Sequence, residues 1–142
     1  MTIGAILKNK GNEVLSLPST ATVGEAVRLL AERRIGAVPV VDDVAVVGIF
    51  SERDVVYGLA RDGGAALDRP LSEVMTTPVQ TVEPADAVIA ALGLMTRRRI
   101  RHLPVVEAGR LVGFVSIGDL VKYRIDRIEA EAAAMRDYIQ QV

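Results

Sequence analysis

The apolar positions of the chain alternate between helical and strand-like spacing, in the same order twice. Segments 23–30 and 88–95 place Val, Ala, Leu and Met three and four residues apart, as on one face of a helix. Thr22 and Glu25 form a candidate capping box before the first of these segments. The pattern therefore predicts an amphipathic helix early in each half of the chain.

Strand-like segments surround each predicted helix. Short apolar segments at Val14–Leu17 and Val79–Val82 precede the helices and are predicted to be strands. A second helix is predicted to begin near Ser51 and near Ser116. Each half is therefore predicted to form a β-α-β-β-α unit. The β-rich runs between the helices are 37–41 and 44–50 in the first half, and 103–106 and 111–115 in the second.

The two halves are copies of one unit. When the sequence is shifted by 65 residues, 15 of the 43 positions from 14 to 56 are identical to their partners without a gap. Pro39 pairs with Pro104 in this register, and Gly48 pairs with Gly113. Two copies are too few for an extended solenoid. We therefore expect each copy to cover the apolar face of the other around a pseudo-twofold axis.

A Gly-x-x-Ser-x-x-Asp motif ends the β-rich region of both copies, at Gly48–Asp54 and Gly113–Asp119. A helix that begins at the serine presents unpaired backbone N–H groups and a positive dipole end, which favour phosphate. The carboxylate that follows is suited to accept both hydroxyl groups of a ribose. The same residues also make a helix cap, which stabilises a helix by about 0.5–2 kcal/mol without a ligand. The motif alone leaves both roles open, and its duplication after a strand favours the nucleotide site.

These motifs resemble those of tandem CBS domains, the module named after cystathionine β-synthase. A hydrophobic-Pro-Val-Val run precedes each motif, at Val38–Val41 and Leu103–Val106, and Val74-Met75-Thr76 is similar to the usual start of such a repeat. The resemblance covers about residues 3 to 125. It implies an α/β (α+β) fold, with two small sheets packed in pseudo-twofold symmetry. The expected divisions are a first repeat at 1–68, a second at 69–125 and a C-terminal helical extension at 126–142.

The resemblance also implies two clefts that bind an adenosine-containing ligand such as AMP, ATP, NAD or S-adenosylmethionine. Such modules usually dimerise and regulate another protein. By resemblance, Asp54 and Asp119 hold ribose, and Ser51 and Ser116 contact ribose or phosphate.

Ile49 and Phe114 each lie two residues before the serine of the motif. In the family this position often lines the adenosine slot. A buried strand residue is an equal alternative for both side chains.

The basic run Arg97–His102 has three interpretations: a nucleic-acid patch, a phosphate site and a solvated helix end. The first is weak, because the chain is nearly neutral and no aromatic residues lie between the charges. Arg101 stands where family members often carry a basic phosphate contact, whereas Gly36 occupies that place in the first copy. Arg53 is a candidate to compensate in one cleft, and its counterpart is Gly118. We therefore expect the two clefts to differ in phosphate affinity. The alternative is a solvated helix end, where cations are favourable.

The composition narrows the functional classes. Seventeen basic and 18 acidic residues give the 142-residue chain a net charge near −1, which argues against nucleic acid as a partner. The chain contains no Cys, which excludes disulfides, thiolate metal sites and thiol catalysis and fits a reducing compartment. No apolar run approaches the roughly 18 residues of a membrane span. We expect a cytoplasmic chain that binds no membrane and no metal.

No catalytic set is found in the sequence. His102 is the only histidine, and without a nucleophile or second histidine it is expected to face solvent beside its strand, although it is also counted among the candidate ligand contacts. The leading hypothesis is therefore a sensor module, not an enzyme, that binds an adenine nucleotide and acts on a partner protein. The alternative is a ligand-free structural or oligomerisation module with degenerate clefts. Retention of both Ser and both Asp residues weighs against that alternative.

The C-terminal segment predicts a long helix with one apolar stripe. From Gly118 onward the chain contains no Pro and no further Gly. Apolar residues recur there at alternating steps of four and three, the spacing of a coiled-coil seam. We expect this stripe to hold a homodimer by meeting a second subunit or the CBS body of the partner, and the alternative is that it folds back on its own repeat. The stripe consists of Val121, Ile125, Ile128, Ala132, Met135 and Ile139.

Overall fold

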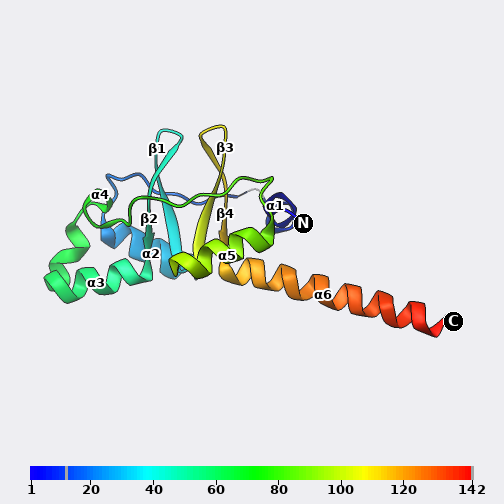
Figure 1. The fold of residues 1–142 in the computed structure, drawn as a ribbon. Coiled ribbons are helices and arrows are strands. Elements are labelled where there is room, and N and C mark those ends of the chain that lie inside the picture. The colour runs from blue at the N-terminus through cyan, green and yellow to red at the C-terminus, as the bar shows by residue number, and fades with distance from the viewer. Residues whose placement is uncertain (12, 142) are drawn as a thin grey trace.

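Two antiparallel hairpins form the centre of the molecule. The structure is a computed structural model that describes residues 1–11 and 13–141. Strand β1 (Ala37–Asp42) pairs with β2 (Ala45–Ser51), and β3 (His102–Glu107) pairs with β4 (Arg110–Ser116). The two hairpins stand side by side (Figure 1), and β2 contacts β4. The duplicated α+β fold with paired sheets is thus confirmed.

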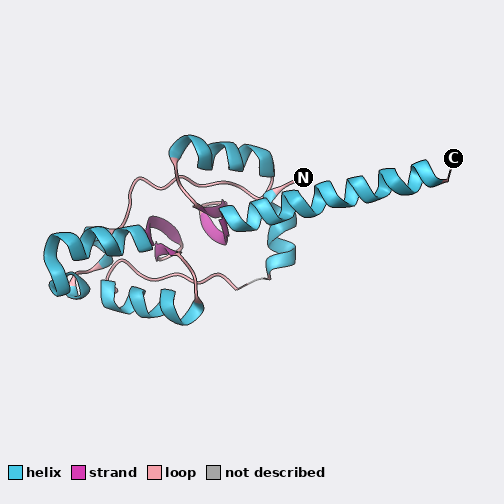
Figure 2. Cartoon of the chain, turned by 90° about the horizontal axis from the view of Figure 1, so that it is seen from below, coloured by secondary structure: helices cyan, strands magenta, loops and turns pink. Residues whose placement is uncertain are grey.

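Helices surround the two hairpins on their outer sides (Figures 1 and 2). The first repeat contributes α2 and α3, and the second contributes α5 and α6 at the equivalent places. The helix bounds are α1 Ile3–Lys10, α2 Val23–Arg33, α3 Glu52–Asp62, α4 Leu71–Val74, α5 Val88–Arg98 and α6 Ile117–Gln140, with a 3-10 helix at Gly63–Asp68.

Local sequence signals explain where these helices begin. The predicted capping box before α2 is present, because the Glu25 N–H donates to the Thr22 hydroxyl and the Thr22 N–H donates to the Glu25 carboxylate. Helices α3 and α6 begin immediately after Ser51 and Ser116, as predicted. Helix α3 is followed directly by the 3-10 helix, which begins at Gly63.

The strands expected at 14–17 and 79–82 are reduced to one bridging residue each. Leu17 pairs in parallel with Val40, and Val82 pairs in parallel with Val105. The bridge in the first repeat consists of Leu17 N–H to the Pro39 carbonyl and Val41 N–H to the Leu17 carbonyl. Extending this ladder backward would require an N–H from the proline, which has none. The proline of each Pro-Val-Val run therefore ends the pairing after one residue.

The core consists of two apolar clusters, one around each hairpin. Phe50 is fully buried in the first cluster, and Met95 and Leu103 are buried in the second. Helix α1 contributes Ile3 and Ile6 to the second cluster, although it lies at the start of the chain. The chain therefore crosses over, so that the N-terminal helix completes the core of the C-terminal repeat.

Helix α6 continues far beyond the two repeats, and Figures 1 and 2 both show it projecting away from them. Leu120 and Tyr123 in its first turns pack on the second cluster. The predicted apolar stripe does not fold back on its own repeat, because its residues are exposed. Within 1–11 and 13–141, no helix is long and apolar enough to cross a membrane.

Candidate functional site

Two clefts open between the repeats, and each takes one wall from either repeat. The Ser51 cleft, of about 340 Å³, combines the end of β2 with the segment that leads into β3. The Ser116 cleft, of about 400 Å³, combines the end of β4 with the segment that leads into β1 and with the end of α1. Because the repeats are related by pseudo-twofold symmetry, the two clefts are built from equivalent positions.

Most of the predicted site residues line one of these clefts. The Ser51 cleft contains Ile49, Ser51, Arg53, Arg101 and His102. The Ser116 cleft contains His102, Phe114, Ser116 and Asp119. Asp54 borders the Ser51 cleft through its contacts with Ser51 and Thr76, and Gly118 lies beside Ser116 without forming part of the cleft wall.

Ile49 and Phe114 belong to the clefts and not to the core. Each is only partly buried, whereas Phe50 and Val115, the next residue in each strand, are completely buried. Strand alternation explains this difference, since neighbouring side chains point to opposite faces of a sheet. The two residues are therefore placed to contact a flat apolar ligand group.

Asp54 is held in place by neutral donors. Its Oδ2 atom accepts a hydrogen bond from the Ser51 N–H at 2.9 Å and from the Ser51 hydroxyl at 3.3 Å. Its Oδ1 atom accepts one from the Thr76 hydroxyl at 2.9 Å. Among the described residues, no cation forms an ion pair with this carboxyl group.

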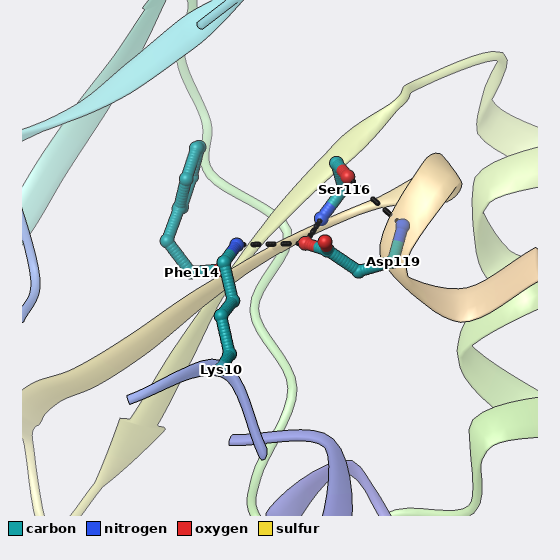
Figure 3. Close-up of polar contacts among 4 residues, drawn as sticks. All are labelled: Lys10, Phe114, Ser116 and Asp119. Atoms are coloured by element: carbon teal, nitrogen blue, oxygen red, sulfur yellow. Dashed lines mark hydrogen bonds and ion pairs between the residues drawn. The ribbon is translucent and has the colours of Figure 1, made fainter. Parts of the chain in front are cut away.

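Asp119 has a different environment, drawn in Figure 3. Its Oδ2 atom lies 2.7 Å from the Lys10 Nζ and accepts the Ser116 N–H at 2.9 Å. The same ammonium group donates to the Phe114 carbonyl at 2.7 Å. Partial burial opposes ionisation of Asp119, but the hydrogen bonds from Lys10 and Ser116 outweigh it and hold the pKa of the carboxyl below its ordinary value.

His102 lies between the two clefts and lines both of them. It is partly buried, and its ring stacks on that of Phe114 with centroids 5.5 Å apart. Burial and the nearby Lys10 ammonium lower the pKa of its imidazole. The prediction that His102 faces solvent is therefore wrong. His102 is the first residue of β3, and it lies at the wall that the two clefts share. Residues of the first repeat cover this side chain, which the sequence alone does not reveal.

The two arginines predicted to bind phosphate line the same cleft. Arg101 and Arg53 both line the Ser51 cleft, together with Arg99. The prediction that Arg53 compensates a cleft without Arg101 is wrong, because Arg101 comes from the second repeat but faces the serine of the first. The Ser116 cleft has Gly36 at the position of Arg101, and its cations are Lys10 and Arg34.

Two of these contacts were missed by the sequence reasoning. The sequence motifs place Thr76 only at a repeat start and assign no role to Lys10. A signal for Lys10 exists in the repeat register. Met75 packs against Gly48, and Leu7 takes the equivalent place against Gly113, whereas the gapless register pairs Met75 with Lys10. The first repeat therefore has three more residues after Leu7 than the second has after Met75. This extra length places the Lys10 ammonium group beside Asp119.

The glycine of each motif is explained by the same packing. A Cβ atom on Gly48 would collide with the Met75 side chain, and one on Gly113 would collide with that of Leu7. These close approaches bring the segment after Met75 and the end of α1 against the two acidic residues. Among residues 1–11 and 13–141, no group of three His, Cys, Asp or Glu side chains is arranged to hold a metal ion.

Comparisons with known proteins give a consistent result. The family model described as CBS domain matches residues 8–61 and 71–126. A mitochondrial CBS domain-containing protein of Arabidopsis thaliana is 32% identical over 148 residues, covering 98% of this chain and 72% of that protein.

Two solved structures extend the likeness to the fold. A CBS-domain containing protein from Agrobacterium tumefaciens superposes with a TM-score of 0.83 at 40% identity, covering 87% of this chain and 99% of that one. A CBS domain protein from Pyrobaculum aerophilum, complexed with AMP, superposes with a TM-score of 0.74 at 35% identity, covering 84% of this chain and 89% of that one.

Proposed function

The chain belongs to the CBS-domain family, and on that premise we propose that it is a regulatory module that binds an adenosine-containing ligand. The observation that carries this proposal is the cleft at each Ser-x-x-Asp helix start. Each cleft borders a carboxylate suited to ribose and includes an apolar side chain, Ile49 or Phe114, suited to adenine. The AMP complex of the related Pyrobaculum protein supports this choice of ligand class.

The Ser51 cleft is the proposed site for ligands that carry phosphate. Arg53, Arg99 and Arg101 line it, and guanidinium groups bind phosphate through several fixed donors. The N-terminus of α3 adds backbone N–H groups beside Ser51. The side-chain oxygens of Asp54, which form no ion pair among the described residues, are the proposed acceptors for the ribose hydroxyl groups.

The Ser116 cleft is proposed to bind phosphate less tightly. It lacks an arginine at the place of Gly36, and its nearest ammonium group already pairs with Asp119. A ligand there competes with Lys10 for the carboxylate. The two sites of one chain are therefore expected to differ in affinity and in preference for phosphate.

Thermal unfolding with AMP, ATP, NAD and S-adenosylmethionine tests this proposal. A ligand at 100 times its dissociation constant stabilises the fold by about 2.7 kcal/mol, which raises Tm measurably. Ribose 5-phosphate, which lacks adenine, is expected to leave Tm unchanged. The double variant Asp54→Ala, Asp119→Ala controls for binding elsewhere. If none of the four ligands raises Tm at millimolar concentration, the ligand-free structural module is the correct function.

The module is proposed to act without catalysing a reaction of its own, as a homodimer that transmits ligand occupancy to a protein partner. A cytoplasmic location belongs to the same proposal and is supported by the cysteine-free composition. Because one relative is mitochondrial by name, cell fractionation is the appropriate check of location.

A further inference from the structure

Helix α6 presents an apolar face that its own chain does not cover. Ile128, Met135 and Ile139 expose 49%, 59% and 64% of their surface. Leu120 and Tyr123 pack on the second repeat from another side of the helix. The stripe therefore runs along a part of α6 that projects away from the two repeats, as Figure 2 shows.

The spacing of the stripe fits a coiled coil. Val121, Ile128 and Met135 repeat every seven residues, and Ile125, Ala132 and Ile139 repeat in the same way between them. The first set occupies d positions of the heptad and the second set occupies a positions. Residues that flank such a seam lie at e and g. They are Lys122, Glu129 and Arg136 at e, and Arg124, Glu131 and Tyr138 at g.

The flanking charges select the partner and its direction. In a parallel pair, a g residue faces the e residue of the following heptad in the partner helix. Arg124 then faces Glu129 of a second copy, and Glu131 faces Arg136. Both pairs have opposite charge, and the twofold axis of a homodimer repeats each of them. Glu131 already pairs with Arg127 at 3.4 Å within the helix and retains a second carboxylate oxygen.

An antiparallel pair of the same helices meets like charges. In such a pair, e residues face e residues and g residues face g residues. Full overlap centred near Ala130 places Glu129 against Glu129 and Glu131 against Glu131, and it brings Lys122 toward Arg136. Like-charged pairs disfavour this arrangement.

We propose that the α6 stripe binds α6 of a second copy of this chain in a parallel two-stranded coiled coil. The two cleft-bearing bodies then lie at the same end of the coiled coil. This association requires no ligand, so it stands or falls separately from adenosine binding.

Light scattering of the full chain tests the association. The native chain is expected to have twice the monomer mass, and Ile128→Glu with Met135→Glu is expected to halve it. The matched control, Ala130→Glu with Ala134→Glu, adds the same charge at f and c positions and is expected to leave the dimer intact. Far-UV circular dichroism and Tm establish that each variant is folded. A monomeric native chain, or a dimer that survives Ile128→Glu with Met135→Glu, overturns the proposal.

A single introduced cysteine tests the direction, since the chain has none of its own. Ile139→Cys occupies an a position near the end of α6, so a parallel pair brings the two thiols together in the seam and oxidation is expected to crosslink most of the dimer. Ala130→Cys on the outer face is the control and is expected to remain uncrosslinked. A dimer in which Ile139→Cys fails to crosslink, or in which Ala130→Cys crosslinks as well, overturns the parallel arrangement.

Discussion

The ammonium group of Lys10 lies 2.7 Å from the Asp119 carboxylate, whereas Asp54, the equivalent residue of the first repeat, accepts a neutral hydroxyl hydrogen bond from Thr76. The two repeats thus keep the same acidic residue and give it different electrostatic surroundings. Lys10 reaches Asp119 because the segment after Leu7 is longer than its counterpart after Met75. A difference in chain length between the repeats therefore makes the two clefts chemically distinct.

Removing the ammonium group is expected to open the Ser116 cleft. Lys10→Met should strengthen adenosine binding there about fivefold, which corresponds to the loss of a competing, partly exposed ion pair of about 1 kcal/mol. On an Asp54→Ala background, isothermal titration calorimetry measures adenosine binding to the Ser116 cleft alone. Lys8→Met, on the same helix, is the control and should change nothing. Weaker adenosine binding by Lys10→Met would show that Lys10 contacts the ligand itself.

Arg101 is expected to bind phosphate in the Ser51 cleft. On an Asp119→Ala background, Arg101→Ala should weaken AMP binding about 10- to 100-fold, since a charge-assisted hydrogen bond contributes about 1.5–3 kcal/mol. Adenosine, which has no phosphate, should bind nearly as before. Arg97→Ala, outside the cleft wall, serves as the control. Equal losses for AMP and adenosine would assign Arg101 a structural role instead.

His102 gives the protein a pH-dependent stability. Burial lowers the pKa of its imidazole below the ordinary 6.5, and the Lys10 charge adds to this effect against the opposing Asp119 and Glu52 carboxylates. The unfolded chain therefore takes up a proton before the folded chain does. The free energy of unfolding should be unaffected above pH 6.5 and should fall as the pH drops from 6.5 through the folded pKa.

Two measurements check this behaviour. As the only histidine, His102 gives one imidazole signal in an NMR titration, and its midpoint is expected below pH 6.5. Urea unfolding of His102→Gln should show less loss of stability than the native chain over the same pH range. A midpoint above 6.5 contradicts the buried environment described for this side chain.

The close approach at Gly48 predicts a steric defect. Gly48→Ala forces a Cβ atom into the Met75 side chain, and overpacking of this kind destabilises a protein by about 1–3 kcal/mol. Adding Met75→Ala should recover part of the loss, because the two residues are in contact. Gly64→Ala is the control, since nothing lies near its Cβ position. Chemical denaturation is measured for the native chain, Gly48→Ala, Met75→Ala, the double variant and Gly64→Ala, and additive losses in the double variant would exclude the proposed collision.

Local patterns were sufficient to predict the hairpins and the main helices of the two repeats, but not α1, α4 or the 3-10 helix. The Thr22–Glu25 capping box, the hairpins and the helix starts at Ser51 and Ser116 all depend on residues close together in the sequence. The length of α6 also follows from a run of helix-forming residues without Pro or Gly. These features depend only on residue spacing and helix capping, so the sequence by itself determined them.

Tertiary packing alone decided how the elements meet. Arg101 lines the same cleft as Ser51, Lys10 pairs with Asp119, and His102 lies between the clefts. These neighbours arise because each cleft takes one wall from either repeat. Each of these contacts joins residues of different repeats or opposite ends of the chain. No local periodicity specifies such a contact, because it arises only when two apolar faces pack and carry the attached polar residues with them. The sequence therefore determined the segments that form the cleft walls, and the packing of the two repeats determined which segments line the same cleft.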